Sequence, residues 1–187
     1  MTRTPSSMVE LGTPMPAFRL PDSSGRKLDS AELDDNPVLV AFLCNHCPFV
    51  KHIAPAFSGF AREYMDRGLA VVAINSNDWT SHPEDSPEKM AEEVRQRDYS
   101  FPYLADETQD VARAFGAACT PDFFLYDRNH QLVYRGQFDD SRPGSDTPVT
   151  GTDLRTACDA VLAGHVPDPQ AQKPSLGCNI KWRAAHT

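Results

Sequence analysis

The sequence lacks several features that would place it at once in a large class of proteins. It has no excess of basic residues, since 18 Lys and Arg face 26 Asp and Glu and the net charge is -8. This acidity, with no basic block to offset it, argues against a nucleic-acid or anionic-membrane partner. No apolar run approaches the roughly 20 residues of a membrane-spanning helix. The first eight residues lack the apolar segment of a signal peptide.

Repeats and low-complexity segments are absent as well, whereas cysteine is present in modest number. The 187 residues suffice for one domain with a core, and 40% hydrophobic and 24% charged residues are usual for a globular protein. Five cysteines without an export signal predict a reducing compartment, the cytoplasm. In such a compartment a close cysteine pair is more often catalytic or metal-binding than structural.

Two cysteines in the segment Cys44-Asn45-His46-Cys47-Pro48 mark a structural boundary. The apolar run 38–43 precedes them, and apolar residues at helical spacing follow up to Tyr64. The pair is therefore expected where a buried strand ends and a helix over about 48–66 begins. The unpaired N–H groups and positive dipole end of a helix start favour a thiolate.

The remaining pattern predicts an α/β fold. A second apolar strand at 69–74 completes a β-α-β unit with a parallel strand pair. An N-terminal hairpin is expected at 17–28, and a second hairpin joins strands 123–126 and 132–135 before a last helix at 152–162. We divide the chain into an extended segment, 1–16, a domain, 17–164, and a tail, 165–187.

Four segments carry a resemblance to a known family: 44–50, 120–127, 138–143 and 177–182. With them the chain resembles thioredoxin-fold proteins, and more narrowly the peroxiredoxin-like branch called alkyl hydroperoxide reductase/thiol-specific antioxidant (AhpC/TSA). The resemblance covers almost the whole chain. It implies a thioredoxin-like fold with a central mixed sheet flanked by helices, an N-terminal β-hairpin extension and a C-terminal tail that packs back on the domain.

The resemblance implies a thiol–disulfide oxidoreductase with a role in thiol redox homeostasis. Cys44 is then the attacking thiol, expected to be the more exposed of the two, and Cys47 is the resolving thiol. A cationic His46 between them would stabilise the thiolate, although a solvated histidine that only shapes the turn is the alternative. Substrates would be disulfide-containing proteins or small molecules, with a cellular thiol as electron donor. No cofactor and no metal are expected.

Thr120 and Pro121 are the expected substrate-binding residues. In the resembled fold a cis proline abuts the two cysteines, and the backbone of the preceding residue pairs with a bound extended peptide. The alternative is an ordinary trans proline that opens a strand.

Three further cysteines need separate interpretations. Cys158 lies on the apolar face of the last predicted helix and is expected to be inert core. Cys119 precedes Thr120 and is either redox-active near the site or a small packing residue. Cys178 lies in a polar, proline-rich tail beside Ile180, and is either a third redox thiol or part of a packed anchor.

A thiol peroxidase is the first rival function, with Cys47 as the peroxidatic thiol followed by Pro48 and resolved by Cys44 or Cys178. The sequence departs from the peroxiredoxin pattern in two places. Cys44 occupies the place of a Thr or Ser, and Pro121 occupies that of an Arg. Arg135 or Arg142 would have to replace this arginine.

A zinc-binding module is the second rival, with Cys44, Cys47, Cys178 and either His46 or His52 as ligands. A redox-inert interaction protein is disfavoured because both cysteines are present. In thioredoxin a buried Asp handles a proton on the strand before the cysteines, and Val38 stands there in this chain. Proton transfer would then need His46, a water or another acid.

Overall fold

A five-stranded mixed sheet with the order β6-β5-β4-β8-β9 forms the centre of the computed structural model, which describes residues 3–33 and 35–184. Strand β4 runs parallel to β5, and β5 runs parallel to β6, while β8 is antiparallel to both β4 and β9. The predicted β-α-β unit and mixed sheet are thereby confirmed. The strands are β4 (Val38–Phe42), β5 (Ala70–Asn75), β6 (Tyr103–Ala105), β8 (Asp122–Tyr126) and β9 (Leu132–Gly136).

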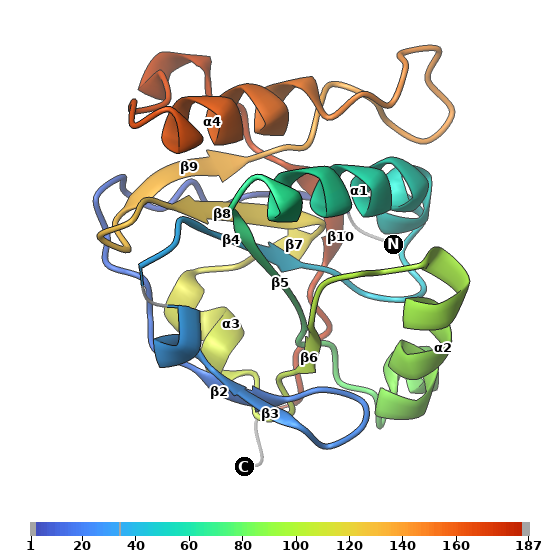
Figure 1. Cartoon of the computed structure of the whole chain (residues 1–187). Helices are drawn as coiled ribbons and strands as arrows, with labels where there is room; N and C mark the ends of the chain where they lie inside the picture. The colour runs from blue at the N-terminus through green and yellow to red at the C-terminus, as the bar shows by residue number, and fades with distance from the viewer. Residues whose placement is uncertain (1–2, 34, 185–187) are drawn as a thin grey trace.

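Both faces of this sheet are covered, which explains the unbroken apolar run in β4. Leu39 and Ala41 belong to one core cluster, and Val38, Val40 and Phe42 belong to the cluster on the opposite face. Every residue of β4 is buried. Figure 1 shows α1 and α4 on one side of the sheet and α3 with the β2–β3 hairpin on the other.

Three helices contribute to the first cluster: α1 (Pro48–Asp66), α2 (Pro87–Arg97) and α4 (Thr152–Leu162). Phe57, Phe60, Ala61 and Tyr64 lie on one stripe of α1 and are fully buried. Phe57 also contacts the rings of Phe123 and Phe138, so the middle of α1 is fixed to the sheet. Helix α1 ends at Asp66, and Gly68 follows with a φ of +98°.

The second cluster lies under α3 (Asp110–Phe115) and the hairpin of β2 (Arg19–Pro21) and β3 (Lys27–Asp29). The rings of Phe18 and Phe115 meet there with centroids 6.0 Å apart. The hairpin predicted for the N-terminal part is confirmed. Short 3₁₀ helices occupy Ser30–Leu33, Pro83–Asp85 and Pro169–Ala171.

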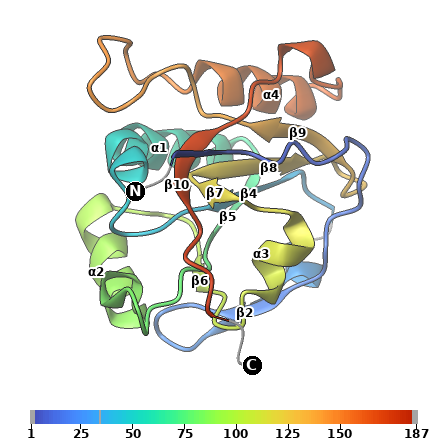
Figure 2. The same ribbon diagram turned by 180° about the vertical axis from the view of Figure 1, so that it is seen from behind.

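A small three-stranded sheet joins the two ends of the described chain. Its order is β1-β10-β7, with β1 at Arg3–Pro5, β7 at Cys119–Thr120 and β10 at Leu176–Asn179. All pairings are antiparallel. Figure 2 shows β10 between the N-terminal strand and β7, close to the start of α1. Part of the tail is therefore a central strand of this sheet.

Membrane-spanning helices were not expected from the sequence. Among the helices in the described parts of the chain, none combines the length and the apolar character that crossing a membrane requires.

Candidate active site

The two cysteines of the predicted redox pair flank the start of α1. Cys44 lies in the turn that follows β4, and Cys47 is the N-cap residue of α1, with Pro48 as the first helical residue. Proline suits this position because its fixed φ matches the helix and it has no N–H to leave unpaired. The buried strand and the helix thus hold the pair as predicted.

The chain has five cysteines, and each carries a thiol in the structure. Three of them lie around Thr120. The Sγ of Cys44 is 3.2 Å from the Thr120 hydroxyl, and the Sγ of Cys47 is 3.3 Å from the Thr120 carbonyl oxygen. The Sγ atoms of Cys47 and Cys178 are 2.7 Å apart. The sequence analysis named all four of these residues, and the structure brings them together.

The peptide bond between Thr120 and Pro121 is cis, as predicted. The strand edge before it is not open, however. In the β7–β10 pairing Cys178 stands opposite Thr120, and Asn179 stands opposite Cys119. A strand from the same chain therefore occupies the position where the sequence analysis expected an extended substrate to pair.

The three thiols differ in acidity. Contact with Cys44 lowers the pKa of Cys47 to about 5 despite burial, and Cys178 and the backbone N–H of Val50 act in the same direction. Burial raises the pKa of Cys44 well above its usual value, and the contact with Cys47 and the charge of Asp85 add to this. Burial and the contact with Cys47 raise the pKa of Cys178 to about 12. The cluster therefore holds one negative charge, centred on Cys47.

Both thiols of the pair are buried, and Cys44, expected to be the more exposed of the two, is so by a small margin only. Cys44 is 2% exposed and Cys47 is 0% exposed. The cause is the packing of Thr120 and β10 against the turn. The chain itself therefore covers both sulfurs.

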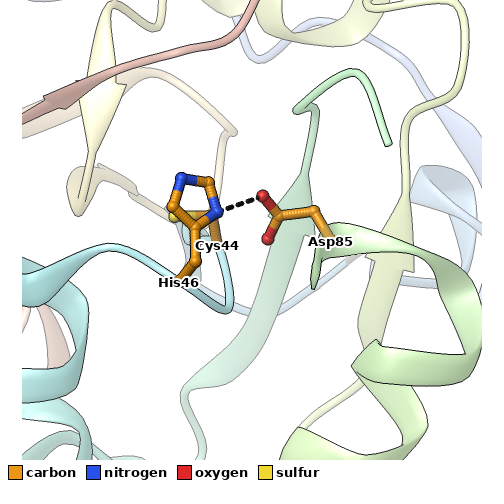
Figure 3. A group of neighbouring side chains, drawn as sticks. All are labelled: Cys44, His46 and Asp85. Atoms are coloured by element: carbon orange, nitrogen blue, oxygen red, sulfur yellow. Dashed lines mark ion pairs between the residues drawn. The ribbon is translucent and has the colours of Figure 1, made fainter. Parts of the chain in front are cut away.

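His46 and Asp85 form an ion pair beside Cys44, with His46 Nδ1 2.6 Å from Asp85 Oδ2 (Figure 3). The contact with Asp85 raises the pKa of His46. Burial alone would raise the pKa of Asp85, but His46 and the backbone N–H of Asn45 outweigh it and lower that pKa. The contact with Asp85 therefore favours the cationic form of His46 next to the thiols.

Asp85 is a site residue that the sequence analysis missed. It ends the 3₁₀ turn Pro83–Asp85, is fully buried, and accepts from the Asn45 amide at 2.7 Å and from the Asn77 side chain at 2.9 Å. Asn75 donates to it as well, at 3.2 Å. Its only signal in the sequence is its place in a polar loop, where an aspartate is ordinarily solvated.

The ring of His82, from the same loop, stacks on His46 with centroids 5.6 Å apart and an interplanar angle of 14°. The side chain of His46 is 15% exposed. Two histidines and one carboxylate thus form a polar group beside Cys44.

Cys44, His46 and Asp85 offer three ligand atoms within 4.8 Å of one another, close enough that their geometry can be compared with that of a metal site. Nitrogen and oxygen ligands about 2.1 Å from a tetrahedral zinc ion stand roughly 3.4 Å apart. The observed 2.6 Å between His46 and Asp85 is too short for that arrangement. The two side chains are paired with each other, and a resident metal does not fit.

The zinc set suggested by the sequence is not the set that assembles. In the described residues Asp85, and not Cys47, Cys178 or His52, joins Cys44 and His46 in the compact group of potential ligands. His52 instead lines a water-sized pocket with Pro121 and Leu176.

Neither arginine suggested as a peroxide-polarising group is directed at the thiols. Arg135 donates to the Val9 carbonyl at 2.8 Å and to Gln172 at 2.7 Å. Arg142 donates to carbonyl oxygens of its own loop and to Gln137. Both guanidinium groups are engaged elsewhere.

The other two cysteines are buried thiols. Cys158 lies in the core under α4, as expected for inert packing, and burial raises its pKa. Cys119 is fully buried next to Thr120, and burial with the charge of Asp122 raises its pKa. Neither thiol is activated as Cys47 is.

Comparisons with known proteins agree with this arrangement. A crystal structure of a hypothetical protein from Sinorhizobium meliloti 1021 is similar with a TM-score of 0.95 and 54% identity, covering 97% of this chain and 100% of that one. The thiol-disulfide oxidoreductase ResA of Halalkalibacterium halodurans is 25% identical over 127 residues, 68% of each chain. A Mycobacterium tuberculosis relative named provisionally as a peroxiredoxin is 30% identical over 139 residues, 74% of this chain and 81% of that one.

Solved structures with the thioredoxin fold, among them a peroxidoxin of Mycobacterium tuberculosis, confirm the expected fold class. Over residues 11–135 the sequence matches the AhpC/TSA family. That segment contains Cys44, Cys47, Asp85 and the cis Thr120–Pro121 bond. The chain belongs to the AhpC/TSA family.

Proposed function

We propose that the chain is a thiol–disulfide oxidoreductase whose redox centre is the Cys44–Cys47 pair. One observation carries the proposal: the two thiols meet at the start of α1 and share one negative charge, with the pKa of Cys47 lowered to about 5. A thiolate at neutral pH is the reactive species in disulfide exchange. The relatives named as thiol-disulfide oxidoreductases support the same class of reaction.

In this proposal Cys44 remains the attacking thiol because it borders the His46 side of the site. Its proton passes to the Cys47 thiolate, with which it is in contact. The Cys44 sulfur attacks a substrate disulfide, and one substrate thiolate leaves. Cys47, deprotonated again, attacks Cys44 and displaces the second thiolate. The protein loses two electrons and two protons and gains the Cys44–Cys47 disulfide, and the substrate becomes two thiols.

His46 supplies the positive charge that balances the thiolate. Asp85 keeps it protonated, and Asp85 itself is fixed by Asn45 and Asn77. Val38 stands where thioredoxin has a buried acid for proton transfer. His46 can take over this role, because its imidazolium can give a proton to the leaving substrate thiolate. Asp85 acts here as a positioning residue.

Cys178 is the third redox thiol of the proposal. Its Sγ lies 2.7 Å from that of Cys47. After the first cycle the Cys178 sulfur can attack Cys47 in the Cys44–Cys47 disulfide. A Cys47–Cys178 disulfide forms, and Cys44 leaves as a thiol with the proton that Cys178 loses. This step would free Cys44 for a second substrate. Simple packing of the segment around Ile180 is the alternative that the experiment below separates.

A thiol peroxidase is the second candidate, and the charge on Cys47 favours it. Cys47 would attack a peroxide and become a sulfenic acid, which Cys44 or Cys178 would resolve. The engagement of Arg135 and Arg142 elsewhere weighs against it, because neither of these two guanidinium groups is directed at the thiols to polarise a peroxide. We therefore place disulfide exchange first.

Thr120 and Pro121 border all of these sulfurs and would orient the substrate. A cellular thiol would return the protein to its reduced state, and a reducing compartment such as the cytoplasm would keep all five cysteines as thiols. The proposal requires no cofactor.

Mass spectrometry of the oxidised protein tests the proposal directly. We expect a Cys44–Cys47 disulfide after one equivalent of a small disulfide, and a Cys47–Cys178 disulfide when Cys44 is replaced in Cys44→Ser. Rapid consumption of hydrogen peroxide that survives in Cys44→Ser and is lost in Cys47→Ser would instead establish the peroxidase. Oxidised protein without a disulfide among these three residues would overturn the redox assignment.

A further inference from the structure

Polypeptide substrates most readily dock beside a reactive sulfur by adding a strand to a free sheet edge. The edge nearest the thiols is β7, because Thr120 contacts both Cys44 and Cys47. That edge is paired with β10, and the other edge of β10 is paired with β1. The β7 edge that faces β10, and both edges of β10, are therefore closed to a substrate strand.

Strand β10 is built tightly against the cis-proline turn. A Cβ at Gly177 would lie 2.0 Å from the Thr120 carbonyl oxygen, so only glycine permits this approach. The Ser175 hydroxyl donates to the Pro121 carbonyl, and the Ser6 amide donates to the Ser175 carbonyl at 2.9 Å. The strand is therefore held by its neighbours on both sides before it reaches Cys178.

The segment after Cys178 is anchored as well. Ile180 is 1% exposed and belongs to the core cluster under α3. Lys181 donates its amide to Asn77 at 2.8 Å, and its carbonyl accepts from Gln109 at 2.8 Å. The Arg183 amide donates to the same Gln109 at 2.9 Å. Displacing β10 would break all of these contacts and expose Ile180.

A surface pocket of about 200 Å³ lies next to His46, whose ring is close to the Cys44 thiol. Its lining consists of Asn45 and His46, the cations Lys51 and Lys89, and the carboxylates Glu84, Glu92 and Glu93, of which Glu92 pairs with Lys89. The pocket has room for one amino-acid-sized arm of a substrate, and it offers charges of both signs to such an arm.

We infer that β10 closes this redox site to extended polypeptides, and that its substrates are small disulfides bearing ammonium and carboxylate groups, which enter beside His46. The inference rests on the proposed function. It replaces the expectation that Thr120 pairs with a substrate peptide, because the chain fills that position with its own strand. The chemistry is the exchange described above, with the two electrons passing from Cys44 and Cys47 to the small disulfide, which leaves as two thiols.

The test compares disulfides of different shape and charge with the full-length reduced protein. Glutathione disulfide, neutral 2-hydroxyethyl disulfide and an unstructured peptide closed by one disulfide are mixed with it, and disulfide formation is followed by quenched flow and mass spectrometry. Glutathione disulfide should react roughly tenfold faster than the peptide. An equal or faster reaction of the peptide would overturn the inference and leave the proposed function intact. No reaction with any of the three would overturn the proposed function.

Two variants sharpen the test. Lys51→Gln combined with Lys89→Gln should lower the rate of reaction with glutathione disulfide about fivefold, and the rate with 2-hydroxyethyl disulfide should not change. If both disulfides slow equally, or neither does, the pocket is not the entry route. Gly177→Ala should force β10 away from Thr120 and accelerate the peptide. Gly59→Ala, in open space on α1, is its matched control. If Gly177→Ala does not fold, the comparison of disulfides with the unmodified protein decides.

Discussion

His46 and Asp85 are joined across two loops by a 2.6 Å contact between imidazole and carboxylate. The contact raises the pKa of His46 above 6.5 and helps to lower that of Asp85 below 3.8. The stability gained through His46 is fully present below pH 6.5 and is lost as the pH rises through the raised pKa. The stability gained through Asp85 is present above pH 3.8 and is lost as the pH falls through the lowered pKa. The pair therefore stabilises the fold most between these two values.

Replacing Asp85 by Asn should return the pKa of His46 towards 6.5, because the neutral amide no longer favours the imidazolium. An NMR titration of the His46 ring measures this directly. Asp98→Asn is the control, since the Asp98 side chain is 89% exposed and far from the site in the chain. An unchanged His46 titration in Asp85→Asn would show that the ion pair does not set the charge of the imidazole.

Replacing Cys47 by Ser should abolish the thiolate present at neutral pH. The pKa of Cys47 is lowered to about 5, whereas that of Cys44 lies above its usual 9.0 because of burial. The ultraviolet absorbance of thiolate, followed against pH, should show one step near pH 5 in the native protein and none there in Cys47→Ser. Cys158→Ala should keep the step. A step that persists in Cys47→Ser would assign the charge to another sulfur.

Asp122 should make the protein less stable at alkaline pH. Burial raises its pKa from 3.8 to about 7 despite the hydrogen bond from Ser6. The folded state thus keeps this proton longer than the unfolded state, and stability falls as the pH rises from 3.8 to about 7 and is then constant. The difference corresponds to a free energy of roughly 4 kcal/mol.

Urea unfolding of Asp122→Asn at two pH values tests this. In the native protein the free energy of unfolding should fall between acidic and alkaline pH, and the neutral amide should remove most of this fall. Relative to the native protein, Asp122→Asn should therefore be more stable at alkaline pH than at acidic pH. A variant with the same pH profile as the native protein would show that Asp122 is already ionised in the fold.

Protein purified without chelator should contain no stoichiometric zinc. The short His46–Asp85 contact leaves no room for an ion between these side chains. Elemental analysis and thermal unfolding with and without a chelator measure this together. One zinc per chain, with a lower melting temperature in chelator, would restore the metal-binding alternative.

Replacing Cys158 by Ala should lower stability without changing redox chemistry. The side chain is fully buried in the cluster under α4, and its removal should cost about 1 kcal/mol. The rate of reaction with glutathione disulfide should be unaltered, because Cys158 contacts none of the three thiols around Thr120. A large change in that rate would give Cys158 a role beyond packing.

The sequence predicted those parts of the fold whose signal is local. An apolar run marks each of the buried strands β4 and β5, and an apolar stripe marks the buried face of α1. These local patterns were enough to predict the two strands, the helix, and the position of Cys44 and Cys47 between β4 and α1. The cis bond at Thr120–Pro121 followed from the family resemblance alone.

Features that depend on distant pairing could not be predicted. Strands β1 and β10 are three and four residues long, too short for a periodic pattern. They pair with each other from opposite ends of the chain, and β10 also pairs with β7 in the middle of it, so no local signal predicts them. The burial of Cys44 is a result of that pairing. Asp85 could not be predicted as a site residue because the groups that pair with it, Asn45 and His46, come from another loop.

The order of synthesis gives the β10 strand a further importance. Cys44, Cys47 and Thr120 all emerge before Leu176–Asn179, so a growing or shortened chain already carries its thiols while the edge of β7 is bare. Such a chain would offer reactive sulfur beside an unpaired strand, a combination that invites mixed disulfides and aggregation. Under the proposed function, the pairing of β10 with β7 would therefore also decide when the redox chemistry becomes selective.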